Sequence, residues 1–173
     1  MKKIFCLISV LLILSSCSVQ EKVSPMIFMK RIIKTDNNLN ADIDSSFVED
    51  NNYICFAKYA EKTDVVFEIK TDEGGNVKKI SLACTQADKT DDFIDCVSSV
   101  IKTYAPDDDV QSVLSSILLT KNTSDNFLYH ETQWYLYSSA VTENGLYFSV
   151  ENKKLIPQSE VELSLKQNDI VEY

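Results

Sequence analysis

The apolar positions of this chain begin as one short continuous run and become periodic only after residue 24. Residues 4–14 are apolar apart from Ser9, and Lys2 and Lys3 precede them. The run is too short to cross a bilayer as a helix, which takes about 20 residues. A positively charged start followed by a short apolar run is typical of a secretory signal.

The first periodic segment predicts a helix over residues 25–35. Ser24 is suited to cap its start, and Pro25 to its first turn, where a missing N–H loses no partner. The partly apolar face of this helix consists of Ile27, Phe28, Arg31 and Ile32. The polar stretch 36–46 that follows is expected to be a connection.

Three strand-like segments come next, over residues 52–59, 64–71 and 77–85. In the second, Val65, Phe67 and Ile69 alternate with polar residues, which is the period of a half-buried strand. The third places Ile80, Leu82 and Cys84 on one face. The connection Asp-Glu-Gly-Gly-Asn is rich in turn residues. We therefore expect a three-stranded antiparallel meander.

Two helices are predicted after the meander. Thr90, followed by two aspartates, is suited to start a helix that runs to Tyr104 and ends before Pro106. Asp107 is expected to cap the second helix. Its apolar residues recur at helical spacing and form one stripe, Val110, Val113, Leu114, Ile117 and Leu118.

The last third of the chain predicts a hairpin and a further strand. Asn144-Gly145 is a strong signal for a two-residue hairpin turn. That turn would pair Val141 with Phe148, Ser139 with Val150 and Tyr137 with Asn152 on the more apolar face. The opposite face would carry the pairs Trp134 and Leu155, Leu136 and Lys153, and Thr142 and Tyr147. The alternation of Val161, Leu163 and Leu165 predicts a final strand.

These elements indicate an α+β fold in which an antiparallel sheet has its helices packed on one face. The expected order is helix, three-strand meander, two helices, hairpin and final strand. If one face of the sheet is free, Trp134, Leu136 and Tyr147 face solvent and form a partner-binding surface, because aromatic side chains are favoured interface anchors. The alternatives are a sheet covered on both faces, or a register shifted by one residue, which would exchange the two faces.

The end of the signal carries a specific motif, Leu14-Ser15-Ser16-Cys17. An aliphatic residue, two small residues and a cysteine resemble the lipobox of bacterial lipoproteins. The resemblance implies a signal peptide over 1–16 and a lipidated cysteine with a short tether over 17–24. The length of the remaining chain, 25–173, is suited to a single domain. The alternative is an ordinary cleaved signal in which the cysteine is incidental.

Lipidation would place the protein on the extracytoplasmic face of a membrane. This is the cell membrane, or the outer membrane if the source is Gram-negative. The partners expected there are the lipid bilayer, through Cys17, and an envelope or membrane protein. Loss of Lys2 and Lys3 with the signal would take the formal net charge from −9 to −11. Nucleic acid is not an expected partner, because its phosphates require clustered Lys and Arg.

Three cysteines lie beyond the tether, and they allow two interpretations. A disulfide between Cys84 and Cys96 would join the third strand to the following helix and stabilise the fold by about 2–4 kcal/mol. The alternative is buried free thiols, which behave as small apolar side chains. In either case Cys55 is expected to be free.

The sequence contains no established catalytic motif. His130 is the only histidine, and neither a nucleophile elbow, an HExxH motif nor a phosphate-binding loop accompanies it. Residues 36–47 resemble a calcium-binding loop at Asp36, Asn38, Asn40 and Asp44. However, Ala41 replaces the turn glycine and Phe47 the bidentate glutamate. We therefore expect no catalytic residue, metal or cofactor.

The function that these features favour is a non-catalytic binding or envelope-associated module anchored by lipid. A small envelope hydrolase or redox enzyme, using His130 with a serine or a reactive cysteine, is the first alternative. Capture of a ligand or of calcium is the second.

Overall fold

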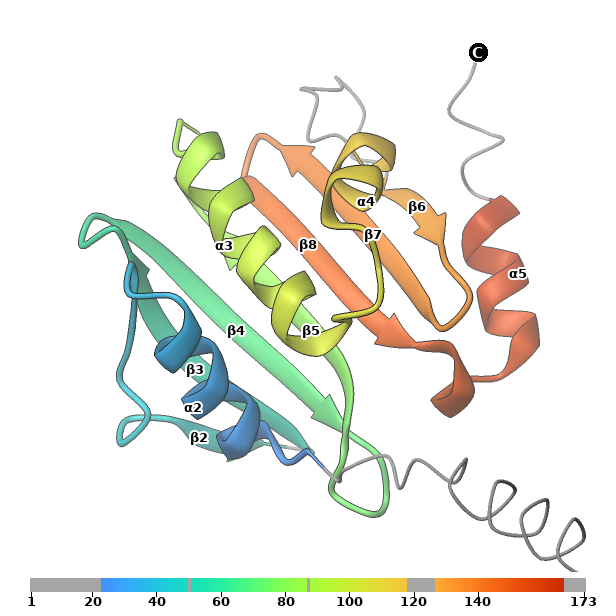
Figure 1. Cartoon of the computed structure of the whole chain (residues 1–173), viewed down its shortest axis with the longest axis horizontal. Coiled ribbons are helices and arrows are strands. Elements are labelled where there is room, and N and C mark those ends of the chain that lie inside the picture. Colours follow the sequence, from blue (N-terminus) through green and yellow to red (C-terminus); the bar gives the residue numbers. More distant parts are fainter. Residues whose placement is uncertain (1–22, 50, 87, 118–126, 167–173) are drawn as a thin grey trace, which may run out of the picture.

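Eight antiparallel strands form one sheet, and α2, α3 and α4 lie over one of its faces (Figure 1). The computed structural model describes residues 23–49, 51–86, 88–117 and 127–166. Its elements are, in chain order, α2 (Pro25–Thr35), β1 (Leu39–Ala41), β2 (Phe47–Glu49), β3 (Asn52–Tyr59), β4 (Thr63–Thr71), β5 (Val77–Cys84), α3 (Thr90–Tyr104), α4 (Val110–Ser116), β6 (Leu128–Glu131), β7 (Tyr135–Thr142), β8 (Gly145–Asn152), the 3₁₀ turn η1 (Lys153–Leu155) and α5 (Gln158–Lys166). The α+β class predicted from the sequence is confirmed.

The strands follow the order β1-β3-β4-β5-β8-β7-β6, and β2 also pairs with β3. The expected meander is present as β3, β4 and β5, and a second meander consists of β6, β7 and β8. β5 and β8 pair antiparallel at the centre and join the two meanders. Since α2 precedes the first meander, and α3 and α4 precede the second, the chain repeats one arrangement of helix and three strands.

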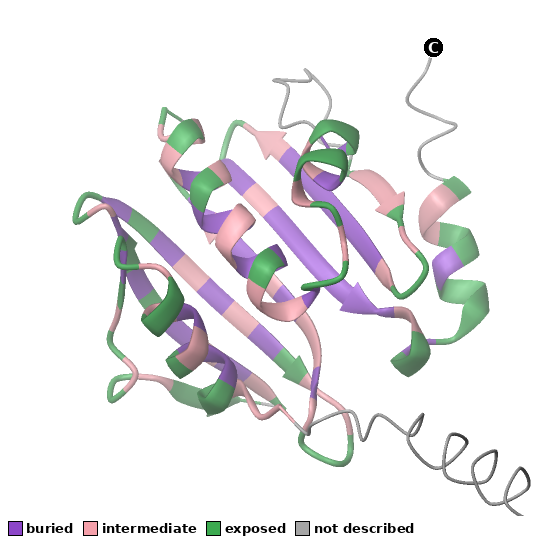
Figure 2. Cartoon of the chain, in the orientation of Figure 1, coloured by how far each residue is buried: buried purple, intermediate pink, exposed green. Residues whose placement is uncertain are grey.

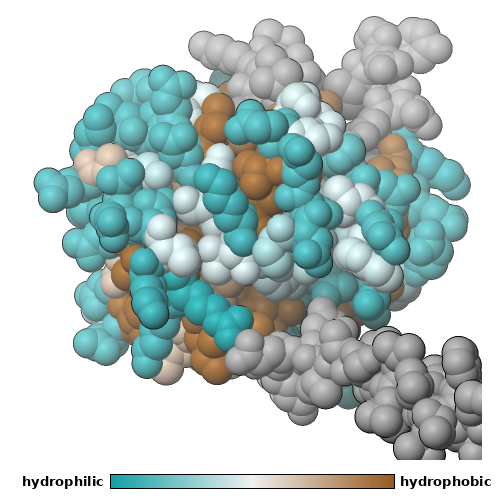
Figure 3. All heavy atoms as spheres, viewed as in Figure 1, coloured by the Kyte–Doolittle hydropathy of each residue, from teal (hydrophilic) through white to brown (hydrophobic). Residues whose placement is uncertain are grey.

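The main core lies between the helices and the sheet. Buried residues alternate with more exposed ones along β3, β4 and β5, whereas β7 and β8 are buried along most of their length (Figure 2). The largest fully buried side chains include Phe28, Phe67, Phe93, Tyr137 and Phe148. On the outer surface of the helices, hydrophilic residues predominate (Figure 3).

The starts of the helices are partly as expected. Ser24 caps α2, since its hydroxyl accepts a hydrogen bond from the Ile27 N–H at 3.4 Å. Ile27, which was expected on the buried face of this helix, is exposed, and Met29 is buried in the core instead. α4 begins later than expected, because Asp109 rather than Asp107 accepts the hydrogen bond from Ser112 N–H at 2.8 Å.

The stretch 36–46 is not only a connection, because β1 forms within it and β2 directly after it. β1 pairs with the end of β3 near Tyr59, and β2 pairs with its start, near Asn52. Three-residue strands leave too little alternation to be recognised in the sequence.

The hairpin of β7 and β8 has the predicted faces and a different register. Thr142 pairs with Gly145, so Glu143 and Asn144 form the turn and each expected pair shifts by two residues. A shift of two keeps every side chain on its face. Of Asn144 and Gly145, only Gly145 has a positive φ, 140°, and a Cβ there would lie 2.2 Å from the Cys84 carbonyl oxygen. Gly145 therefore allows β8 to approach β5.

The predicted final strand is wrong, because residues 158–166 form α5. Val161 is fully buried in a small second core with Leu136 and Ile156, and Leu165 packs against it. Residues 161 and 165 are one helical turn apart, so they share a helix face as well as a strand face. Since Leu136 lies on the side of the sheet opposite α2, α3 and α4, the three predicted helices pack on one face as expected, and α5 lies on the other face.

Candidate functional site

The face of the sheet opposite α2, α3 and α4 is covered by α5 only along β6 and β7, within the described residues. We call this surface the open face. The antiparallel registers place its side chains in rows that run across the strands. Three of these rows make up a groove beside α5.

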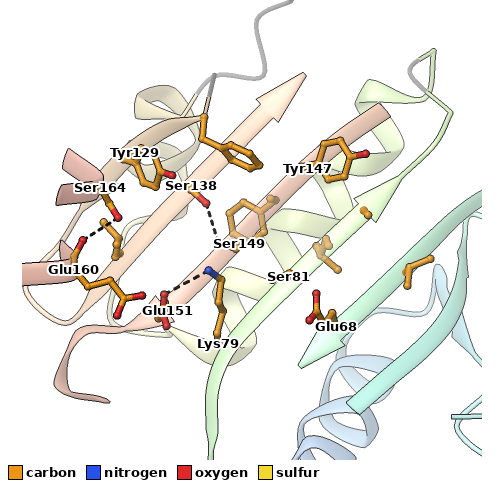
Figure 4. Close-up of a pocket in the computed structure, with 16 residues that line it drawn as sticks. Glu68, Lys79, Ser81, Tyr129, Ser138, Tyr147, Ser149, Glu151, Glu160 and Ser164 are labelled. Atoms are coloured by element: carbon orange, nitrogen blue, oxygen red, sulfur yellow. Dashed lines mark hydrogen bonds and ion pairs between the residues drawn. The ribbon is translucent and has the colours of Figure 1, made fainter. Parts of the chain in front are cut away.

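The central row consists of three serines on adjacent strands. Ser81 on β5 is the register partner of Ser149 on β8, which in turn pairs with Ser138 on β7. We call these residues the serine row. The hydroxyls of Ser138 and Ser149 lie 2.8 Å apart and share a hydrogen bond. Small side chains at the centre of the sheet give the groove a low, polar floor (Figure 4).

The row nearer the β7–β8 turn is apolar and aromatic. It consists of Ala83, Tyr147 and Ala140. The Phe127 ring lies 6.5 Å from the Tyr147 ring and 6.4 Å from that of Tyr129, centroid to centroid. Burial raises the pKa of the Tyr129 hydroxyl. These aromatic side chains form one border of the groove.

The row on the other side of the serines is charged but paired. Glu151 is 7% exposed, and its carboxylate lies 3.5 Å from the Lys79 ammonium and 3.9 Å from that of Lys78. On the neighbouring strand Lys70 lies 3.7 Å from Glu68. The open face is therefore close to neutral here, although the whole chain is acidic.

α5 forms the wall of the groove along β7. Glu160 and Ser164 face it from this helix (Figure 4). The cavity volume is about 510 Å³, within the range of roughly 300–1,000 Å³ for small-molecule sites. This groove is the candidate site.

The open face continues beyond the groove to the first strands of the sheet. There Phe56 is 54% and Phe47 44% exposed, with their ring centroids 6.5 Å apart. Ile54, the register partner of Phe47, and Val66 lie on the same face. Exposed aromatic side chains in one cluster are typical of an interaction surface.

The predicted partner-binding residues do not form one patch. Tyr147 lies in the groove and is half-buried. Leu136 is only 5% exposed because α5 covers it, so the prediction that it faces solvent is wrong. Trp134 precedes β7 and lies at the end of the hairpin opposite the β7–β8 turn. The groove and Trp134 are therefore separate surfaces.

All three cysteines of the described domain are buried and free. The structure contains no bond between Cys84 and Cys96, and the disulfide stays a prediction. Burial raises the pKa of the Cys84 thiol, and more strongly that of Cys96. Because the thiolate is the reactive form, a raised pKa disfavours a redox or nucleophilic role.

His130 is on the wrong side of the sheet to act with the serine row. It is the register partner of Tyr137, whose side chain is in the main core, and the two rings are stacked at 6.4 Å. The serines point to the opposite face. Within the described residues, the fold does not bring His130 and the serine row together as a nucleophile and base.

The residues that resemble a calcium loop serve the fold instead. The Asp36 carboxylate accepts hydrogen bonds from the Ser99 hydroxyl and from the Asn38 N–H, and Asp42 accepts two from Ser45. Asn40 is in β1. No group of three or more His, Cys, Asp or Glu side chains that could hold a metal ion occurs in the described ranges.

Residues 1–16 and Cys17 lie outside the described residues, so the signal and the lipidation site stay predictions. None of the helices in the described part of the chain is both long and apolar enough to span a membrane.

Sequence reasoning missed the serine row and the cluster around Phe56. The alternation within each strand indicates which residues share a face, but the row exists only because β5 pairs with β8. That pairing joins segments more than 60 residues apart, and no local signal specifies it.

Comparisons with protein-family models, with curated protein sequences and with solved structures found no match.

Proposed function

We propose that this chain is a lipoprotein, anchored through Cys17 on the extracytoplasmic face of a membrane, whose domain is a non-catalytic binding module. The lipobox-like motif supports the anchoring. The observation that supports binding is the open face, which combines a groove with exposed aromatic side chains. Its partner is a protein of the envelope or of the same membrane.

The chemistry of the open face favours binding over catalysis. Three of its lysines lie within 4 Å of a carboxylate, namely Lys79 with Glu151, Lys70 with Glu68 and Lys58 with Asp64. A nearly neutral surface with an aromatic cluster can be desolvated by a protein partner at low electrostatic cost. Phe56 and Tyr147 are the side chains we expect to contribute most.

Anchoring is tested by replacing the acylated residue. Cys17→Ser should move the protein from the membrane fraction to the soluble fraction, because stable attachment requires the acyl chains. Cys55→Ser is the matched control and should stay in the membrane fraction. Retention of Cys17→Ser in membranes would contradict lipid anchoring at this position.

Partner binding is tested by crosslinking the anchored protein and identifying what co-purifies. Phe56→Ser and Tyr147→Ala, both on the open face, should lose the crosslinked partner. Ile27→Ser, an exposed apolar residue of α2 on the other side of the domain, should keep it. Capture that is the same in all three variants would exclude the open face as the binding surface.

Capture of a small ligand in the groove is a second candidate, which the cavity volume favours. A ligand would raise the thermal unfolding temperature of the wild-type protein. Ala83→Leu, which fills the groove beside the serine row, should remove that shift. A shift that persists in Ala83→Leu would mean that the ligand binds elsewhere.

A further inference from the structure

Three segments of the chain meet at one end of the sheet, where the described chain begins. The Val23 carbonyl accepts a hydrogen bond from the Val77 N–H at 2.9 Å. Val23 also lines a groove together with Lys154 and Leu155 of η1. In Figure 1 the start of α2, the β4–β5 turn and the segment after β8 lie at this end. We call it the tether end.

The tether end carries a tryptophan, a lysine and a leucine, namely Trp134, Lys154 and Leu155. The lysine contacts the tryptophan ring, and the leucine follows the lysine in the chain. The Lys154 ammonium lies 4.0 Å from the centre of the Trp134 ring. The Trp134 carbonyl accepts a hydrogen bond from the Lys153 N–H at 2.9 Å, which fixes the β6–β7 turn against η1. Trp134 is 39% and Leu155 37% exposed. Both apolar groups are therefore available to a partner.

This combination fits the interface between lipid headgroups and acyl chains. Tryptophan is enriched at that depth, because its ring is apolar and its indole N–H can still form a hydrogen bond. A neighbouring lysine can reach phosphate oxygens while its alkyl chain stays on apolar surface.

The length of the tether limits what the tether end can face. Six residue steps separate Cys17 from Val23, and an extended chain spans at most about 3.5 Å per residue. If Cys17 carries the lipid, Val23 is thus within about 20 Å of the membrane surface. Such a short tether gives the tether end a high effective concentration at the bilayer, so a weak contact suffices.

We propose that Trp134, Leu155 and Lys154 form a membrane-docking surface that inserts among the headgroups of the bilayer holding Cys17. This inference rests on the proposed lipidation. Asp72 and Asp107 line the same groove as Lys154, and Lys153 is 2.9 Å from Glu131. The negative charges of these carboxylates offset the positive charges of the lysines. Insertion of the apolar side chains, rather than attraction to anionic lipid, is therefore the main contribution to the free energy of docking.

Docking at this end would also orient the binding site. The strands of β7 and β8 run from the tether end to the turn at Gly145, a length of about 25 Å at 3.3 Å per residue. The open face would then stand away from the membrane, with Tyr147 near its outer end. A partner in the same membrane or envelope could reach it from the side.

The test uses the fluorescence of Trp134, which is the only tryptophan of the chain. The mature, lipidated protein, which begins at Cys17, is reconstituted in phosphatidylcholine vesicles whose acyl chains carry bromine near the headgroup end. Bromine quenches a tryptophan in contact with it. We expect most of the fluorescence to be lost relative to vesicles without bromine, together with a blue shift of the emission.

Leu155→Ser should weaken this quenching, because it removes part of the inserted surface. Leu163→Ser is the matched control, since Leu163 is an exposed leucine of α5 outside the tether end. In this variant the fluorescence of Trp134 should be quenched as in the wild type. Co-sedimentation with the vesicles without quenching would overturn the docking surface and leave the anchoring intact. Failure of the acylated protein to co-sediment would overturn both.

Discussion

A single residue, Gly145, explains why the two meanders of the sheet can join through β5 and β8. Gly145 begins β8 directly against the backbone of β5, where a side chain has no room. Its φ of 140° lies in a region that other residues rarely adopt. The Asn-Gly pair in the sequence indicates only a turn, because the contact of Gly145 with Cys84 depends on a pairing between distant segments.

Gly145→Ala should lower the free energy of unfolding by at least about 2 kcal/mol, because backbone strain and a steric clash add up. Gly75→Asn is the matched control. Gly75 also has a positive φ, 76°, but a Cβ there would have no neighbour within 4 Å, and asparagine tolerates this conformation. Denaturant unfolding measures both. Equal effects of the two substitutions would contradict the close approach of β8 to β5.

The state of the thiols is a second test at the residue scale. Alkylation of the denatured protein without reductant should modify Cys55, Cys84 and Cys96, because all three are free in the structure. In the folded protein the same reaction should be slow, because burial raises the pKa of each thiol. Modification of Cys55 alone after denaturation would show that the predicted Cys84–Cys96 disulfide forms.

At the scale of elements, long periodic segments were predictable and short or ambiguous ones were not. Within the described residues, the five longest strands and the helices α2, α3 and α4 follow from alternation or helical spacing. β1 and β2 were missed because three residues carry too little pattern. Residues 158–166 were misassigned because Val161 and Leu165 fit both periods. The helix is selected because α5 buries Leu136, and this tertiary contact is not visible in the sequence pattern.

The helical state of residues 158–166 can be tested at Leu163, which is 64% exposed and so contributes little to the core. Leu163→Pro should remove the hydrogen-exchange protection of α5, since proline in a helix interior costs about 3 kcal/mol relative to alanine. Leu163→Ala should retain it. Because α5 packs on a separate small core, protection of β3, β4 and β5 should persist in both variants. Equal protection of residues 158–166 in both variants would exclude the helix.

At the scale of the whole molecule, buried tyrosines link stability to pH. Burial is the main cause that raises the pKa of Tyr59 to about 12. The pKa values of Tyr104 and Tyr137 are also raised, mainly by burial. The folded state therefore holds these phenolic protons more tightly than the unfolded chain does. The resulting stabilisation is complete below about pH 10 and is lost as the pH rises through the folded-state values.

Denaturant unfolding across the range from about pH 9 to 12 should show this loss of stability. Tyr59→Phe should lose less stability over the same range, because it lacks one of the titrating groups. The lysines lose charge in both proteins, so they do not account for the difference. The same pH dependence in Tyr59→Phe and in the wild type would contradict a raised pKa at Tyr59.

The central claim, lipid anchoring of this domain, is tested most directly by the intact mass of the protein purified from membranes. The account predicts a chain that begins at Cys17 and carries a diacylglyceryl group on that residue, with residues 1–16 removed. Cleavage at another position, or an unmodified Cys17, would contradict the lipoprotein assignment and the membrane-docking surface that rests on it.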